Sequence, residues 1–436
     1  MNFPSARAAL NSLPQGVRQI AIGSIWLVLA AALGQGAMLL ANLIVAQLLG
    51  VADYGRYALL QSTVMMLAGI AQLGFALIVA QQISTLRETQ PGLAGEVAAF
   101  CMLVTALLSV GLSVALYFAR EPLAAALFRD EGLGRAIAIG AIALPWAAIA
   151  AVQLGLFNGL ERFRDQAMIS LATLPIVVAL PAFGAWRGGL EGALMGLSGA
   201  YFLRSAASHW RLATVLRDAG IRWKFGSFRN KIRLLRNYAL PATLSGLTTM
   251  FAMWGGQTLL VRSPGDSVAV GIFAAGYAIK TMAMFIPTQM LGALMPALSR
   301  GHARGDGAER RLLLRYNAAT ACGIAILTAI GGALLAPWLM RLFGDGFVGG
   351  ETTLRLLLLA TPLEALSVTL YQDIQSKGRY WVNLWWVNVP RAVAVLAAAA
   401  LLVPHRLSEG LALAWLIGWT VALAGTILSM MAEKRG

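Results

Sequence analysis

The segment PLAAALFRD at residues 122–130 returns in altered form as PWLMRLFGD at residues 337–345, with proline, leucine, phenylalanine and aspartate at matching places. The offset between the two copies is about half of the 436-residue chain. Other pairs keep nearly the same offset in the same order: Gly55 with Gly271, Tyr57 with Phe273, Pro145 with Pro362, Arg162 with Arg379, and Pro175 with Pro390. Because turn and kink residues share one offset, the sequence predicts two copies of one folding unit.

Both copies consist largely of apolar residues. Hydrophobic residues make up 58% of the chain and charged residues only 12%, whereas about 25% of the residues of a soluble domain are charged. A bilayer span needs roughly 20 apolar residues. Twelve such runs are present, at residues 17–48, 55–84, 97–119, 136–158, 166–186, 190–211, 237–261, 267–299, 313–338, 353–375, 381–402 and 410–431. We therefore predict an all-α polytopic membrane protein.

The basic residues predict its orientation. An even number of spans places both termini on one side, and cytoplasmic termini put most of the Lys and Arg in cytoplasmic loops and tails, as the positive-inside rule requires. The richest loop reads RDAGIRWKFGSFRNKIRLLRN at residues 217–237. Alternating basic and aromatic residues also bind single-stranded nucleic acid, but between two spans they favour an anionic membrane surface. We expect a bilayer partner and no nucleic acid.

The duplication predicts the domain organisation. We expect an N-terminal lobe of six helices at residues 1–216, a basic amphipathic cytoplasmic linker at residues 217–236, and a C-terminal lobe of six helices at residues 237–436. Because six is even, both lobes cross the membrane in the same direction and are related by a pseudo-twofold axis along the membrane normal. Transporters of this kind hold their substrate between the lobes, near the middle of the membrane.

Three basic residues lie deep within predicted spans, away from their ends: Lys280, Arg391 and Arg204. Lys280 lies roughly 18 Å deep, at 1.5 Å per residue, and a cation there costs at least about 2.5–3.5 kcal/mol unless it faces water or a partner. Glu364 is the only acidic residue deep within a span, and Asp373 lies nearer the end of the same span. One alternative is an internal ion pair with Glu364. Three cations exceed one carboxylate, however, which predicts an anionic substrate and makes Glu364 and Asp373 candidates for ion coupling.

Uncharged polar residues accompany these charges. Tyr277 and Thr281 share a side of the helix with Lys280, and Gln35 and Asn42 are seven residues apart on one face of the first span. Such residues line cavities or hold helices together by hydrogen bonds, and the sequence leaves both roles open.

Two further arginines, Arg162 and Arg379, occupy matching places at the predicted cytoplasmic ends of the two copies. They are candidates for a cytoplasmic gate, and the alternative is that they only anchor the cytoplasmic side. The sequence contains no P-loop and no HExxH motif, and its two cysteines fall in apolar runs. We therefore expect no enzyme activity, no cofactor and no metal site, and a secondary mechanism driven by protons or sodium.

Three motifs carry a family resemblance: DYGRYAL at residues 53–59, LGFALIVAQQIS at residues 73–84, and LFNGLERF at residues 156–163. With the basic central loop, they make the chain resemble the polysaccharide and lipid-linked oligosaccharide flippases of the MOP superfamily. The resemblance implies twelve helices in two lobes that open alternately to each side. It also implies movement of undecaprenyl-pyrophosphate-linked sugars from the cytoplasmic to the periplasmic leaflet of a bacterial inner membrane, alongside polysaccharide assembly proteins.

Two alternatives remain. The multidrug branch of the superfamily typically relies on an acidic residue in its first or seventh helix, and residues 17–48 and 237–261 contain neither Asp nor Glu. This disfavours an ion-coupled multidrug or metabolite antiporter. A membrane glycosyltransferase or polymerase is also disfavoured, because such enzymes usually carry their chemistry in a large outer loop and the predicted outer loops are short.

Overall fold

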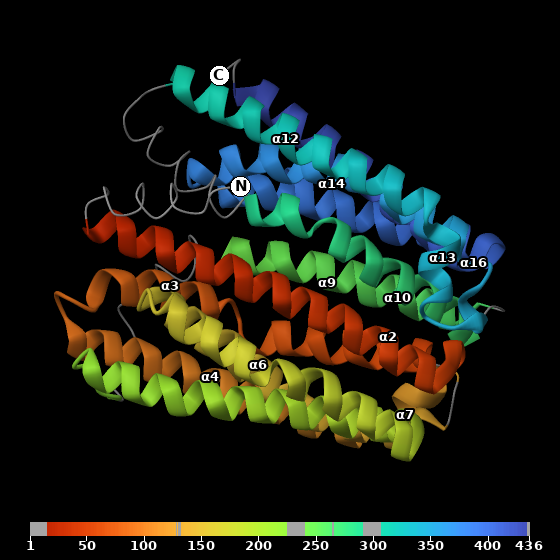
Figure 1. The fold of residues 1–436 in the computed structure, drawn as a ribbon, viewed down its shortest axis with the longest axis horizontal. Coiled ribbons are helices and arrows are strands. Elements are labelled where there is room, and N and C mark those ends of the chain that lie inside the picture. The colour runs from red at the N-terminus through yellow and green to blue at the C-terminus, as the bar shows by residue number, and fades with distance from the viewer. Residues whose placement is uncertain are drawn as a thin grey trace, which may run out of the picture.

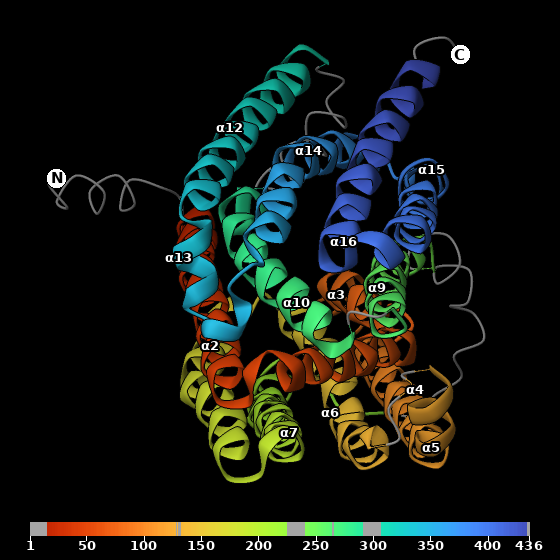
Figure 2. The same cartoon turned by 90° about the vertical axis from the view of Figure 1, so that its right-hand side faces the viewer.

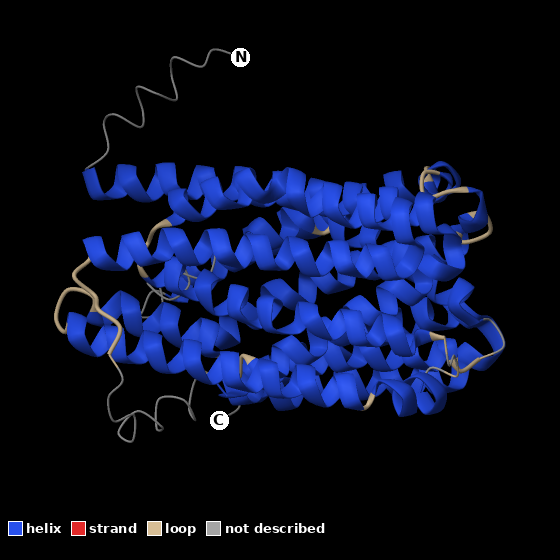
Figure 3. Cartoon of the chain, turned by 90° about the horizontal axis from the view of Figure 1, so that it is seen from below, coloured by secondary structure: helices blue, strands red, loops and turns tan. Residues whose placement is uncertain are grey.

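The computed structural model describes residues 15–127, 129, 132–224, 240–263, 266–290 and 307–433. All regular secondary structure in these ranges is helical (Figure 3). The helices run roughly parallel to one long direction of the molecule (Figure 1). The predicted linker at residues 217–236 lies mostly outside the described residues, which end at residue 224 before resuming at residue 240.

The N-terminal half of the chain forms one packed group of helices. Its elements are α2 (Gln15–Ala71), α3 (Phe75–Leu86), α4 (Pro91–Phe118), α5 (Arg120–Pro122), the π-helix η1 (Leu123–Leu127), α6 (Leu133–Gly159) and α7 (Phe163–Asp218). Helix α7 packs on α2 and α6, and α6 packs on α3 and α4. This group occupies the lower part of Figure 1.

The C-terminal half forms the second group, in the upper part of the same view and of Figure 2. Its elements are α9 (Leu240–Val261), α10 (Asp266–Ala283), α12 (Gly307–Leu334), α13 (Ala336–Arg341), the 3₁₀-helix η4 (Asp345–Phe347), α14 (Glu351–Ser376), α15 (Tyr380–Asn383), the π-helix η5 (Leu384–Asn388) and α16 (Val389–Glu433). Helix α14 packs against α10, α12 and α16, and α9 packs against α16.

Seven described helices are long and apolar enough to cross a membrane. Three of them contain a sharp break: α2 at Gly50, α7 at Gly188 and Gly189, and α16 at Leu407. Each break falls between two predicted spans, and the arms of α7 pack closely enough that a Cβ on Gly184 would lie 2.0 Å from the Gly192 carbonyl oxygen. The prediction of an all-α polytopic protein is confirmed, and the number of twelve spans stays a prediction.

Breaks also fall inside predicted spans. Helix α10 ends at Ala283 within the predicted span 267–299, and α12 ends at Leu334 within the predicted span 313–338. Residues 55–84 were expected to form a single helix, but α2 ends at Ala71 and α3 begins at Phe75. Leu73 and Gly74 have φ angles of 44° and 69°, the left-handed region that ends a helix and that glycine adopts at little cost.

The two halves meet where α2 packs on α10, through contacts that mirror each other. A Cβ on Gly55 would lie 1.9 Å from the Ser267 carbonyl oxygen, and a Cβ on Gly271 would lie 2.1 Å from the Val51 carbonyl oxygen. Val51 and Ser267 are related by the same repeat offset as Gly55 and Gly271. Reciprocal contact of this kind is what a twofold axis produces. We call these four residues the seal.

A second reciprocal contact lies beside the seal. The side chain of Gln47 donates a hydrogen bond to the Leu342 carbonyl oxygen at 2.7 Å, and Arg129 donates to the Arg262 carbonyl oxygen at 3.4 Å. In each case the end of one helix contacts the duplicated loop motif of the opposite half. The repeat found in the sequence is therefore also a repeat of contacts.

The close contacts of the seal predict that replacing either of its glycines destabilises the folded protein. In Gly55→Ala and Gly271→Ala, the new methyl group overlaps a backbone oxygen and forces α2 and α10 apart, at about 1–3 kcal/mol each. We expect each variant to lower the thermal unfolding midpoint of the detergent-purified protein by several degrees. The matched control is Gly323→Ala, where a Cβ meets nothing within 4 Å. Unfolding midpoints equal to that of the control would contradict the close packing.

Candidate functional site

A central cavity of about 500 Å³ lies between helices from both halves. It is lined by residues of α2, α6, α7, α10 and α14 and by residues that follow α10, and the charged residues among the described lining are Arg204, Lys280 and Glu364. We call it the cationic chamber. A side branch of about 220 Å³ shares Leu154 and Arg204 with it. The formal charge of the chamber wall is therefore one unit positive.

A further cavity of about 370 Å³ shares Gln35, Met38, Tyr277 and Thr281 with the cationic chamber. None of the described residues that line it is charged, and we call it the uncharged chamber. Because the two cavities share four lining residues, they form adjoining parts of one space between the halves.

Lys280 lies on the wall of the cationic chamber, where only 4% of its surface is exposed. Its ammonium group forms an ion pair with the Glu364 carboxylate of α14, and its Nζ lies 5.2 Å from the centre of the Tyr277 ring. Tyr277, Lys280 and Thr281 share one side of α10, as the helical repeat predicted. A carboxylate and an aromatic face together stabilise a cation that hydrocarbon would exclude.

Arg204 on α7 has a different environment. It is half-buried and lines both the cationic chamber and the side branch. Within the part of the chain that the structure describes, its guanidinium forms no ion pair and no hydrogen bond. The charge of Arg204 thus faces the cavity without a protein partner.

Arg391 is placed away from this wall. It is buried on α16, donates a hydrogen bond to the Thr249 hydroxyl of α9, and lies 4.4 Å from the centre of the Trp419 ring. It does not line the cationic chamber, its side branch or the uncharged chamber. The structure therefore brings Lys280 and Arg204 to one cavity and holds Arg391 between α9 and α16.

Asp373 is likewise separate from Lys280. It is buried near the end of α14, and its Oδ2 lies 3.1 Å from the Nζ of Lys377, one helical turn further on. Glu364, in contrast, lies on the cavity wall. Of the two acidic residues suggested for coupling, Glu364 is the one in contact with a cavity cation.

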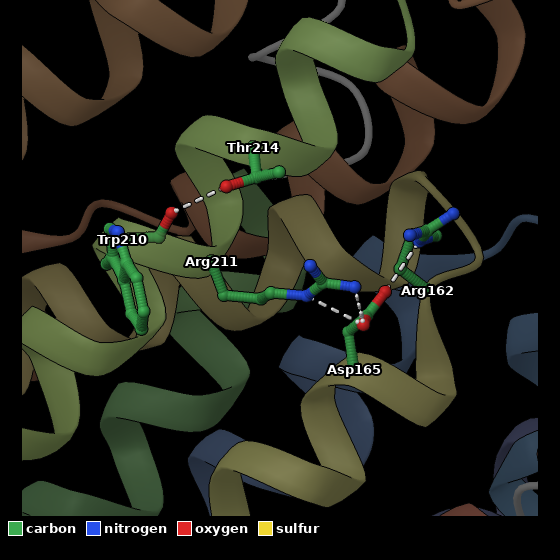
Figure 4. Close-up of polar contacts among 5 residues, drawn as sticks. All are labelled: Arg162, Asp165, Trp210, Arg211 and Thr214. Atoms are coloured by element: carbon green, nitrogen blue, oxygen red, sulfur yellow. Dashed lines mark hydrogen bonds and ion pairs between the residues drawn. The ribbon is translucent and has the colours of Figure 1, made fainter.

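The two proposed gate arginines lie near helix starts. Arg162 precedes α7, and its Nε donates to Asp165 Oδ2 at 2.6 Å; Arg211 donates to Asp165 Oδ1 from Nε and Nη2 at 2.8 and 2.5 Å (Figure 4). Asp165 thereby joins the two ends of the α7 hairpin within one half. Arg379 is the residue before α15. The gate itself stays a prediction.

Sequence reasoning identified Gln35 and Asn42, which both line the cavity, but missed most of the other polar residues there. Among those missed are Gln61, Ser62, Gln166, Ser170, Tyr201 and Gln257. One signal was present for some of them: Gln166 and Ser170 are four residues apart and so share a face of an otherwise apolar helix. Gln61 and Ser62 are adjacent on α2, while Tyr201 is on α7 and Gln257 on α9, and no helical spacing in the sequence connects these three positions.

The family model of the polysaccharide biosynthesis proteins matches residues 20–302, well over half of the chain. The chain belongs to this family. A relative from Ralstonia nicotianae, the EPS I polysaccharide export inner membrane protein EpsE, is 24% identical over 376 residues, which cover 85% of this chain and 84% of the relative.

Solved structures of the MOP superfamily share the architecture. An inward-facing multidrug resistance MATE transporter has a TM-score of 0.76 at 16% identity, covering 92% of this chain and 95% of its own. The inward closed conformation of the lipid II flippase MurJ has a TM-score of 0.74 at 11% identity, covering 93% and 87%. These similarities establish the fold. This polysaccharide biosynthesis family member is a multi-pass membrane protein with the fold of these transporters.

The Lys280–Glu364 pair predicts an unequal response to single and double substitution. Lys280→Met leaves a buried carboxylate unpaired, a change that costs about 3–5 kcal/mol in buried pairs. We expect a clear fall in the thermal unfolding midpoint for this variant and recovery of most of it in Lys280→Met/Glu364→Gln. Arg135→Met serves as the control, because its pair with Glu191 is exposed and such pairs contribute little. A double variant as unstable as the single variant would contradict the pairing.

Proposed function

We propose that this protein is an inner-membrane flippase that moves an undecaprenyl-pyrophosphate-linked oligosaccharide from the cytoplasmic to the periplasmic leaflet for surface polysaccharide biosynthesis. The observation that carries the proposal is Arg204, a cation on the wall of a cavity between membrane-spanning helices with no partner among the described residues. An unpaired charge at such a site is costly. An anionic headgroup that binds there offsets this cost.

A pyrophosphate fits the two cations of the cationic chamber. The planar guanidinium of Arg204 can form two parallel hydrogen bonds to phosphate oxygens, and the ammonium of Lys280 acts as a compact point charge on a flexible stem. Lys280 is shared with Glu364. A proton or sodium ion taken up by Glu364 would free Lys280 for the phosphate, and this exchange would couple transport to an ion gradient.

Alternating access follows from the position of the seal. Our topology prediction assigns the turn at Gly50 and the start of α10 to the periplasmic side, so a closed seal corresponds to a cavity that opens toward the cytoplasm. In this proposal the lobes at residues 1–216 and 237–436 rock about their pseudo-twofold axis, the seal separates, and the headgroup meets the periplasm. The lipid tail stays in the bilayer outside the cavity.

The named relatives support a polysaccharide precursor as substrate. EpsE is described as a polysaccharide export protein and MurJ as a lipid II flippase. Enzymes that build the lipid-linked precursor and proteins that assemble the polymer would then act before and after this transporter. The multidrug antiporter alternative is weakened by the positive cavity wall, since an exporter of cationic drugs needs acidic residues there.

The proposal predicts that Arg204 is required for export. In a strain that lacks this protein, we expect Arg204→Gln to restore less than about one tenth of the surface polysaccharide restored by the wild type, because hydrogen bonds to charged groups contribute about 1.5–3 kcal/mol each. Lipid-linked precursor should accumulate in these cells. The measurements are surface glycan and extracted precursor at matched protein levels.

The matched control is Arg187→Gln, an exposed arginine on the same helix that stacks on Phe183 and Trp186. It should restore export fully. Normal export by both Arg204→Gln and the triple variant Arg204→Gln/Lys280→Met/Glu364→Gln would contradict the proposal. Cells that become sensitive to drugs while their surface glycan is unchanged would favour the antiporter.

A further inference from the structure

The uncharged chamber has walls of a distinct chemistry. Amide and hydroxyl groups of Asn42, Gln61, Ser62 and Gln257 line it together with tyrosines, and its lining carries no charge within the part of the chain that the structure describes. The adjoining cationic chamber carries both of the cavity cations described above. One space between the two halves therefore offers two kinds of binding surface.

The order of these surfaces along α10 is fixed by its sequence. Gly271 of the seal comes first, Ala274 and Ala278 of the uncharged chamber follow, and Lys280 of the cationic chamber comes later. At 1.5 Å per residue, Ala274 lies about 5 Å beyond the seal and about 9 Å before Lys280. The uncharged chamber thus lies between the seal and the cations.

Several polar groups of this chamber have hydrogen-bonding capacity left over. Asn42 and Gln35 form no side-chain hydrogen bond to any other residue that the structure describes. The Ser62 hydroxyl lies 2.5 Å from Gln257 Oε1 and 2.8 Å from the Leu59 carbonyl oxygen, and its single proton serves one of them at a time. The amide nitrogen of Gln257 forms no hydrogen bond to another described residue and remains a donor. Polar residues between membrane helices often hold those helices together by hydrogen bonds. Asn42 and Gln35 form no such interhelical hydrogen bond in the described part of the chain.

We propose that the uncharged chamber binds the sugar next to the pyrophosphate, and that this sugar is neutral. The inference rests on the proposed function, since it places the pyrophosphate at Lys280 and Arg204. Amides and hydroxyls match the donors and acceptors of sugar hydroxyl or acetamido groups. An acidic sugar would leave its carboxylate in a chamber without a cation, and burying an unpaired charge is costly. The substrate therefore enters with its sugar toward the seal and its lipid toward the cations.

The test compares lipid pyrophosphates with and without a sugar. Purified protein in nanodiscs is titrated with undecaprenyl pyrophosphate, with the same lipid carrying glucose, galactose or N-acetylglucosamine, and with the lipid carrying glucuronic acid. We expect at least one neutral sugar to tighten binding about tenfold relative to the unsubstituted lipid, as a few net hydrogen bonds allow. Glucuronic acid should give no such gain.

The variant is Asn42→Leu/Gln61→Leu, whose two positions line only the uncharged chamber. In this variant, the neutral sugar should no longer tighten binding tenfold, whereas unsubstituted undecaprenyl pyrophosphate should bind as tightly as it does to the wild type. Wild-type affinity for the unsubstituted lipid also shows that the variant is folded. Asn42→Ser/Gln61→Asn, which retains polar groups, should keep part of the gain. Gln289→Leu makes the same chemical change in the cationic chamber only and should keep all of it.

The failures are distinguishable. If unsubstituted undecaprenyl pyrophosphate binds but no neutral sugar tightens binding, or if the Leu variant keeps the gain, the sugar site is overturned while the proposed function survives. If glucuronic acid gives the largest gain, the neutrality of the sugar is wrong. If the wild type binds neither the bare nor any sugar-bearing lipid, the proposed function falls, and the sugar site falls with it.

Discussion

A charged side chain within a membrane must find a partner or water, and this constraint organises the interior of the protein. Three cations deep within membrane-spanning helices meet it differently. Lys280 pairs with Glu364, Arg391 contacts a hydroxyl and the face of Trp419, and Arg204 faces the cavity. Only the last arrangement leaves a positive charge for a ligand. We place the headgroup site at Arg204 because this cation has no partner among the described residues. The number of cations alone would not identify the site.

The duplicated scaffold is symmetric where the halves seal and asymmetric where the chemistry lies. Gly55 and Gly271 make equivalent close contacts with Ser267 and Val51 across the axis. The repeat offset of 216 residues pairs Lys280 with Val64, which is 2% exposed and packs with Ala143 and Leu144 in the N-terminal half. At this matched position, the first copy thus has an apolar residue packed in its core, and the second copy has a charged residue on the cavity wall.

Much of the fold could be predicted from the sequence, because hydrocarbon imposes a length and a composition on every span. The breaks at Gly50, Gly188 and Leu407 all fall between predicted spans. The break at Leu73 and Gly74 was missed because apolar residues continue on both sides of it. An ion pair between Lys280 and Glu364 could be suggested, since each was the exceptional charge in its span.

The position of Arg391 could not be predicted. Thr249 and Trp419 draw its guanidinium between α9 and α16, and neither partner is marked by spacing or by charge. Gln61 and Gln257 were overlooked for the same reason, because their convergence on one chamber depends on packing between distant helices.

The central claim is that the cationic chamber receives a lipid-linked pyrophosphate, and its most direct test is an electron cryomicroscopy structure of the protein in nanodiscs with undecaprenyl pyrophosphate. We predict density for the two phosphates within hydrogen-bonding distance of Arg204, with the Lys280 ammonium turned toward them and the lipid chain leaving between the halves. Phosphate density bound elsewhere, with the cationic chamber still empty and Lys280 still on Glu364, would contradict the account.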